Sequence, residues 1–421
     1  MIFFDNWFFV LFLAFYVIYL AVEVGLDLIN LNYIDKHKNT IPKLFVGVYS
    51  EEDYKKSIEY TKTKTNFRIF QTLIKTIILF IFIFSGFFET TNNYLTNLLP
   101  NSPFISGVSY PFVIGFVFMI LGLPESYYFQ FVIEEKFGFN KMDKKTFILD
   151  TIKSSILGLV FGIPLLAGLL WFIDNFADNW WIFGAALILG FQLFTAAIYP
   201  VVLAPIFNKF TPLVDGSLKN QITDLAKKVN FKMSGIFTID GSKRSSHSNA
   251  YFAGMGSMKR IVLFDTLINK HSEDEIVAVI AHEMGHNVKK HIQKSLMLSC
   301  IVVALSFYAL ALCLKWDLFF NAFGVSTPSA HVGLVLFALF SSVFMFPIAP
   351  IFTKISRKNE FEADNFAVIT TKNKTNLSQA LVKLTKENLG NLTPHPYYSA
   401  YHYSHPTTLE RVEAINKINI L

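Results

Sequence analysis

Three residues with the spacing of a metal site stand close together: His282, Glu283 and His286 form an HExxH sequence. Residues four apart on a helix share one face, so both imidazoles can bind the same ion. Glu283 stands where its carboxylate reaches a metal-bound water rather than the metal. Ser272 and Glu275 form a capping box that predicts the start of this helix. The pattern predicts a metallopeptidase with one catalytic Zn²⁺ per chain.

A catalytic zinc site needs a third protein ligand. The metzincin continuation would place a histidine at 292, but the chain has Ile292. The segment 356–364 just after the last apolar stretch holds two glutamates, and we expect Glu360 to be the ligand. It shares a helical face with Asp364, whose carboxylate can orient a ligand histidine. Glu362 lies about 200° round the helix from Glu360, and we expect it to be a solvated surface carboxylate.

Three other histidines lie near these motifs in the sequence. His291 lies well round a continuous helix from the ligand face, so we expect a surface residue near the membrane. His402 and His405 stand just before a second capping box, Thr407 with Glu410. The residues alone favour ordinary loop histidines at both positions.

Seven apolar stretches dominate the chain of 421 residues, which is 52% hydrophobic with 46 Phe and a mean hydropathy of +0.42. Each stretch can cross ~30 Å of hydrocarbon. They lie near 7–29, 70–88, 104–123, 154–173, 180–206, 295–314 and 331–352. We therefore expect a mainly α membrane protein in a lipid bilayer. The net charge is +6, but the lysines lie between the apolar stretches rather than on one basic domain. This distribution argues against nucleic-acid binding.

Lysine and arginine gather in alternate loops. The loop 31–70 is rich in them, whereas 89–103 has none. The positive-inside rule then places the N-terminus outside or in a lumen and the C-terminus in the cytoplasm. Glu23 and Asp27 lie near a cytoplasmic end of the first stretch, where we expect them to face water. The two cysteines, Cys300 and Cys313, share one apolar stretch, so they indicate neither a disulfide framework nor a metal site.

Two polar regions, 208–294 and 353–421, fall on the cytoplasmic side and are expected to form one catalytic domain. Short apolar segments at 235–240, 249–253 and 260–264 predict a small sheet. The expected division has four parts. These are 1–206 with five membrane helices and cytoplasmic loops, 207–294 with the HExxH, 295–352 with two more membrane helices, and 353–421 with the third ligand.

Together these segments resemble the type I CAAX prenyl endopeptidases, which are membrane zinc proteases acting on farnesylated or geranylgeranylated proteins. The resemblance rests on the HExxH, Glu360 with Asp364, and the stretches 131–141, 200–213, 246–252 and 402–411. It implies a seven-helix transmembrane barrel around a chamber, with a cytoplasmic zincin-like α+β catalytic domain. It also implies His282, His286 and Glu360 as ligands and Glu283 as general base.

The same resemblance implies that His405 lies opposite the metal and stabilises the oxyanion, and that Asn249 with Ala250 holds the substrate backbone as an added strand. The leaving amine would take its proton from Glu283 or, less simply, from Asp364. The expected reaction removes the C-terminal aaX tripeptide from prenylated CAAX proteins or another extended polypeptide. We expect a monomer in a bacterial inner membrane or the endoplasmic reticulum.

Two alternatives remain open from the sequence. A membrane-protein quality-control protease without prenyl preference would carry the same zinc residues. A transporter or inactive scaffold would be expected to show paired repeats and charges in the middle of the membrane. The intact HExxH with Glu360 argues against that second class.

Overall fold

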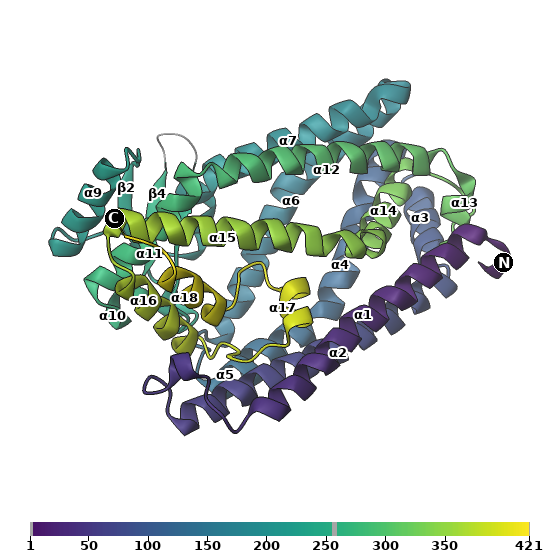
Figure 1. The fold of residues 1–421 in the computed structure, drawn as a ribbon. Coiled ribbons are helices and arrows are strands. Elements are labelled where there is room, and N and C mark those ends of the chain that lie inside the picture. Colours follow the sequence, from purple (N-terminus) through teal and green to yellow (C-terminus); the bar gives the residue numbers. More distant parts are fainter. Residues whose placement is uncertain (1–2, 255–258, 421) are drawn as a thin grey trace.

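The computed structural model describes residues 3–254 and 259–420, so the two ends of the predicted division, residues 1 and 421, lie outside it. Figure 1 shows long helices that run from the end of the molecule with the N-terminus towards a more compact part. The strands, most of the short helices and the C-terminus gather in that part. The molecule therefore has an end built of long helices and a mixed end, in which strands and short helices pack together.

Within the described residues, seven helical segments are long and apolar enough to cross a membrane, which confirms the predicted spans. They comprise α1 (Trp7–His37), α2 (Glu51–Phe84), α4 (Pro103–Tyr128) with α5 (Glu135–Phe137), α6 (Lys144–Asn175), α7 (Trp180–Ile198) with α8 (Ala204–Phe207), α12 (His291–Leu314), and α14 (Ala330–Met345) with α15 (Ala349–Thr371). Several helices extend well beyond the apolar stretches. Lysine and glutamate are good helix formers, so hydropathy marks the bilayer rather than the end of a helix.

Aromatic packing closes the end of the molecule that holds the N-terminus. Phe323 and Phe340 stack with ring centroids 3.8 Å apart, and Phe12 of α1 packs against both. Two short helices complete this end, α13 (Asp317–Asn321) and α3 (Phe87–Leu98), the latter in a stretch expected to be a loop. A cavity of about 1120 Å³ lies between α1, α2, α4 and α14, in line with the expected chamber.

The mixed end holds a small sheet whose described strands have the order β1-β2-β4-β3. The strands are β1 (Phe210–Pro212), β2 (Gly235–Ile239), β3 (Ala250–Ala253) and β4 (Arg260–Phe264). β2 and β4 are parallel, and the other pairs are antiparallel. The three predicted segments are confirmed. β1 was not predicted because three residues that include a proline are too short to show an alternating pattern.

The remaining helices pack around one core. They are α9 (Ser217–Lys228), α10 (Asp265–Lys270), α11 (Glu273–Val288), α16 (Thr375–Glu387), α17 (Pro396–His402) and α18 (Thr408–Asn416). The core combines buried residues from both polar regions, such as Ile222, Ile280 and Ile415, with Phe45 from the connection between α1 and α2. The expected boundaries at 206, 294 and 352 fall inside α8, α12 and α15, because these helices continue from one part into the next.

One acidic residue of α1, Asp27, differs from the expectation. Asp27 is only 3% exposed, and both of its carboxylate oxygens accept hydrogen bonds from Arg68 of α2. Arg68 also donates to the hydroxyl of Tyr398 on α17 at 2.7 Å. The expectation that Asp27 faces water is therefore wrong, because α1 packs against α2 at this level.

Candidate active site

Close contact between α11 and α15 assembles the site from two distant parts of the sequence. α11 begins at the predicted Ser272–Glu275 capping box and carries the HExxH, whereas α15 carries Glu360. Gly285 makes the approach possible, because a Cβ at this position would lie 3.1 Å from backbone atoms of Ala363. A side chain at Gly285 would therefore push the two helices apart.

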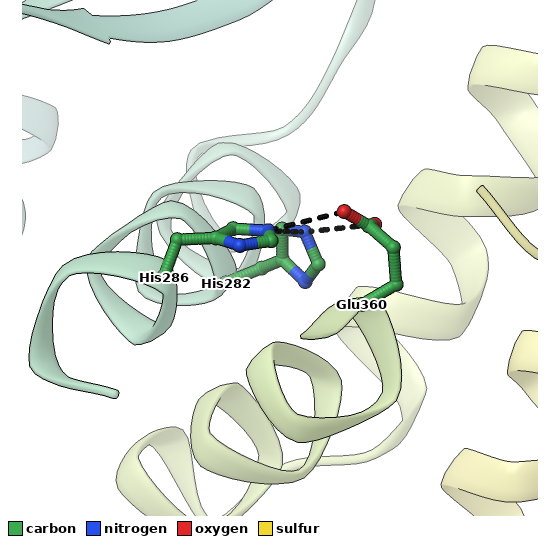
Figure 2. A group of neighbouring side chains, drawn as sticks. All are labelled: His282, His286 and Glu360. Atoms are coloured by element: carbon green, nitrogen blue, oxygen red, sulfur yellow. Dashed lines mark hydrogen bonds and ion pairs between the residues drawn. The ribbon is translucent and has the colours of Figure 1, made fainter. Parts of the chain in front are cut away.

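Figure 2 shows the side chains of His282, His286 and Glu360 pointing towards one another. The two histidine Nε2 atoms lie 3.2 Å apart. The Glu360 oxygens lie 3.4 Å from Nε2 of His282 and 3.2 Å from Nε2 of His286. His282 and Glu360 are buried, so three donor atoms converge in a site largely shielded from water.

The donor set fits a zinc ion. Donors ~2.0–2.1 Å from a tetrahedral zinc must lie roughly 3.3–3.4 Å from each other, close to the distances found here. Among the described residues, the buried Oε2 of Glu360 has no hydrogen-bond partner although His282 stands beside it. A carboxylate oxygen and two imidazole nitrogens that face each other in this way are suited to a shared cation.

Asp364 stands behind the first ligand histidine. Its Oδ1 lies 2.8 Å from Nδ1 of His282, which leaves Nε2 of that ring free of hydrogen and aimed at Glu360. Arg411 of α18 donates to both Asp364 oxygens, at 2.6 and 2.8 Å. This placement supports the orienting role. It offers no path to a leaving amine, since both oxygens are occupied and the side chain is 1% exposed.

His291 and Glu362 differ from the sequence-based expectation. His291 is 3% exposed rather than a surface residue, and its Nδ1 lies 3.1 Å from Nδ1 of the ligand His286. Its Nε2 lies 3.1 Å from an oxygen of Glu362, which is therefore not a free surface carboxylate. The expectation assumed one continuous helix, whereas α11 ends at Val288 and a new helix begins at His291.

Glu283 lines a cavity of about 420 Å³ together with the three ligand side chains. Burial raises the pKa of this carboxyl, while the neighbouring His282 and His286 oppose that shift. A carboxylate with a raised pKa holds a proton more readily than one in water. Because it lines the cavity beside the ligand side chains, Glu283 is placed to take a proton from a water there.

Asn249 and Ala250 line the same cavity at the start of β3. β3 is the last strand of the described sheet, and it pairs only with β4 on its inner side. The Asn249 carbonyl accepts from Phe264 of β4, and its side-chain oxygen accepts from its own neighbour Ala250 at 2.8 Å. The outer edge of β3 can therefore receive another extended chain beside the metal ligands.

The two loop histidines have different surroundings. His405 lines the cavity, and its Nε2 lies 3.4 Å from an oxygen of Glu360. The hydroxyl of Ser404 lies 2.9 Å from Nδ1 of the same ring. His402 instead points towards Glu23 of α1, 4.0 Å away, and does not line the cavity of the ligands. Of these two loop histidines, the structure brings His405 and not His402 to the metal ligands.

Sequence reasoning missed Arg411. It is buried, holds Asp364, lies 3.5 Å from Glu360 and lines the cavity. The one signal was its position on α18, one residue before Val412 and on the helix opened by the Thr407 capping box. A charged residue on the inner side of an amphipathic helix needs a buried partner.

Comparison with known proteins identifies the family. Residues 30–209 match the CAAX prenyl protease N-terminal domain of five membrane helices, and residues 212–419 match peptidase family M48. The chain belongs to the M48 family of CAAX prenyl proteases. It is 38% identical to a CAAX prenyl protease 1 homolog of Dictyostelium discoideum over 91% of both chains. A homolog from Arabidopsis thaliana is 38% identical over 96% of both chains.

A solved structure agrees with this assignment. The crystal structure of S. mikatae Ste24p matches with a TM-score of 0.89 and 35% identity, over 97% of this chain and 98% of the other. This M48 peptidase is therefore a multi-pass membrane metallopeptidase with the fold of seven long helices and a mixed catalytic part.

Proposed function

We propose that this M48 peptidase is a zinc enzyme that removes the last three residues of prenylated CAAX proteins. The observation that carries the proposal is the convergence of His282, His286 and Glu360 beside Glu283 and the open edge of β3. Relatives that carry the name CAAX prenyl protease 1 cover nearly the whole chain. Their name supports the substrate class, and the donor set supports zinc as the metal.

Each residue of the cavity has a role in this proposal. His282, His286 and Glu360 would hold the zinc ion, which would supply Lewis acidity to a scissile carbonyl and to a bound water. Glu283 accepts the proton of the attacking water and delivers it to the leaving amine. His405 donates a hydrogen bond from Nε2 to the developing negative charge on the carbonyl oxygen, with the Ser404 hydroxyl donating to Nδ1.

The substrate would bind as an added strand along β3. The Asn249 side chain is exposed to the cavity, and its oxygen accepts a hydrogen bond from the backbone N–H of Ala250. The side-chain N–H groups of Asn249 are left for a substrate carbonyl. The prenyl group would lie among the apolar side chains that dominate the cavity of about 1120 Å³. Burying a prenyl chain contributes ~0.8 kcal/mol per CH₂, so several kcal/mol are available.

Digestion of matched peptides tests the proposal. We expect the purified enzyme to cut a farnesylated CAAX peptide on the C-terminal side of the modified cysteine. Its KM should be at least about tenfold lower than for the unmodified peptide, since 1.4 kcal/mol already gives a factor of ten. Mass spectrometry locates the cut, and the Glu283→Gln variant serves as the inactive control. Equal KM values with cuts scattered along both peptides would instead support a quality-control protease.

The orientation in the membrane is part of the proposal. The lysine distribution supports an N-terminus outside or in a lumen and a cytoplasmic catalytic part, in a bacterial inner membrane or the endoplasmic reticulum. A single chain supplies the complete ligand set, which supports action as a monomer. Cysteines placed at the exposed Thr90 and Thr327 of a chain without Cys300 and Cys313 should react with an impermeant reagent from outside. If a cysteine placed at the exposed Lys55 reacted from outside instead, the protein would have the opposite orientation.

A further inference from the structure

A break between α11 and α12 brings a third histidine to the ligand His286. α11 ends at Val288, and α12 begins at His291. Lys290 between them has a φ of +59°, in the left-handed region that lysine rarely adopts. In one continuous helix, His291 would lie about 140° round the axis from His286. The break instead turns its ring back, so that the two Nδ1 atoms lie 3.1 Å apart.

The hydrogen bonds of His291 define which nitrogen carries hydrogen. The carboxylate of Glu362 can only accept, so Nε2 of His291 donates to it across 3.1 Å. In a neutral imidazole the other nitrogen is then an acceptor, and Nδ1 of His291 accepts from Nδ1 of His286. His286 is left with a lone pair on Nε2, which is the atom aimed at Glu360 across 3.2 Å.

We propose that His291 and Glu362 are positioning residues that hold His286 in the tautomer and orientation needed for metal binding. The inference rests on the proposed metal site and adds a second support to it. His282 is held directly by a carboxylate, that of Asp364 at 2.8 Å. His286 is held by a carboxylate through an intervening imidazole. Burial of His291, at 3% exposure, shields this link from competing water.

Zinc affinity, measured by competition with a chelator, tests the inference without relying on peptide cleavage. Removing a partner of a metal-bound histidine typically weakens metal affinity 10–100-fold. We expect a loss of about this size for His291→Phe, which keeps an aromatic ring but cannot accept a hydrogen bond. Glu362→Leu should show a similar loss. Glu362→Gln keeps an acceptor oxygen, and we expect it to stay within about threefold of the parent protein.

Lys358→Met is the matched control on the same helix. Lys358 forms an ion pair of 3.8 Å with Oε1 of Glu362, whereas His291 contacts Oε2. We expect its zinc affinity to be unchanged. Glu362 is partly exposed, so its variants are expected to fold even if His291→Phe does not. The visible spectrum of the cobalt-substituted protein gives a second readout, because it changes when the geometry of the ligands changes.

The inference would be overturned if His291→Phe and Glu362→Leu both kept the zinc affinity of the parent protein. It would also be overturned if Glu362→Gln or Lys358→Met lost as much zinc affinity as Glu362→Leu. Glu360→Ala separates this failure from failure of the proposed function. If Glu360→Ala loses zinc while the His291 and Glu362 variants retain it, only the positioning role is wrong. If Glu360→Ala also retains zinc, the metal site itself is wrong.

Discussion

Two groups of polar and charged side chains, each with a buried carboxylate, connect distant parts of this chain, and they differ in how completely their atoms are paired. The zinc cluster consists of His282, His286, Glu360, Asp364 and Arg411. The interhelical cluster consists of Asp27, Arg68 and Tyr398. Each joins a helix near the C-terminus to helices far away in sequence.

The difference between them lies in the unpaired atoms. In the interhelical cluster, both oxygens of Asp27 accept from Arg68, and Arg68 also donates to Tyr398. In the zinc cluster, Asp364 is equally well paired, but Oε2 of Glu360 has no hydrogen bond among the described residues. Charged side chains whose polar atoms are all paired serve to link helices. Metal-ligating oxygen and nitrogen atoms that face each other without a hydrogen bond between them instead indicate a ligand site.

The largest effect should come from Glu283→Gln, which alters the base without touching a metal ligand. We expect peptide cleavage to fall about 10²–10⁴-fold, the usual contribution of a general base. Zinc content, measured by elemental analysis, should not change. Glu273→Gln, an exposed acid on the same helix, is the control and should keep full activity. Loss of zinc in Glu283→Gln would show that this carboxylate is a ligand instead.

Asp364→Asn should affect both the metal and the fold. It removes the charge that faces the buried Arg411, so we expect the free energy of unfolding to fall by about 3–5 kcal/mol. Because the support of His282 is weakened, zinc affinity should drop roughly 10–100-fold. Chelator competition and denaturant unfolding measure the two effects. A variant that is destabilised but binds zinc as tightly as the parent would reduce Asp364 to a structural residue.

Asp27→Leu should show the opposite balance, with a loss of stability and no loss of zinc. Arg68 is 40% exposed and can still reach water, so the expected loss is about 1–3 kcal/mol. Arg68→Met added to Asp27→Leu should recover part of it, because no unpaired charge remains. A weaker zinc affinity in Asp27→Leu would show that the two clusters are coupled.

The smallest effect is expected for Tyr398→Phe, which removes one hydrogen bond of 2.7 Å from Arg68 and keeps the ring. The free energy of unfolding should fall by about 1 kcal/mol. Tyr397→Phe, at a neighbouring side chain that is 72% exposed, should have no measurable effect. Equal effects from both substitutions would argue that the Arg68 contact contributes nothing.

The sequence predicted the parts of this protein that depend on neighbours along the chain. The HExxH spacing follows the period of a helix, and both capping boxes involve residues three apart. The seven apolar stretches and the three short strands were recognised by length and alternation in the same way. The helical face that Glu360 shares with Asp364 favours it over Glu362 as a ligand, and the structure places Glu360 beside the histidines.

Only the tertiary structure decided the surroundings of those residues. Arg411 reaches Asp364 because α18 packs against α15, and His291 reaches His286 because the chain turns at Lys290. Asp27 is buried because α2 supplies Arg68. A local pattern reports which face of an element a residue occupies, but a buried charge is stabilised by a partner that the pattern does not contain. That partner is set by how helices far apart in sequence pack together.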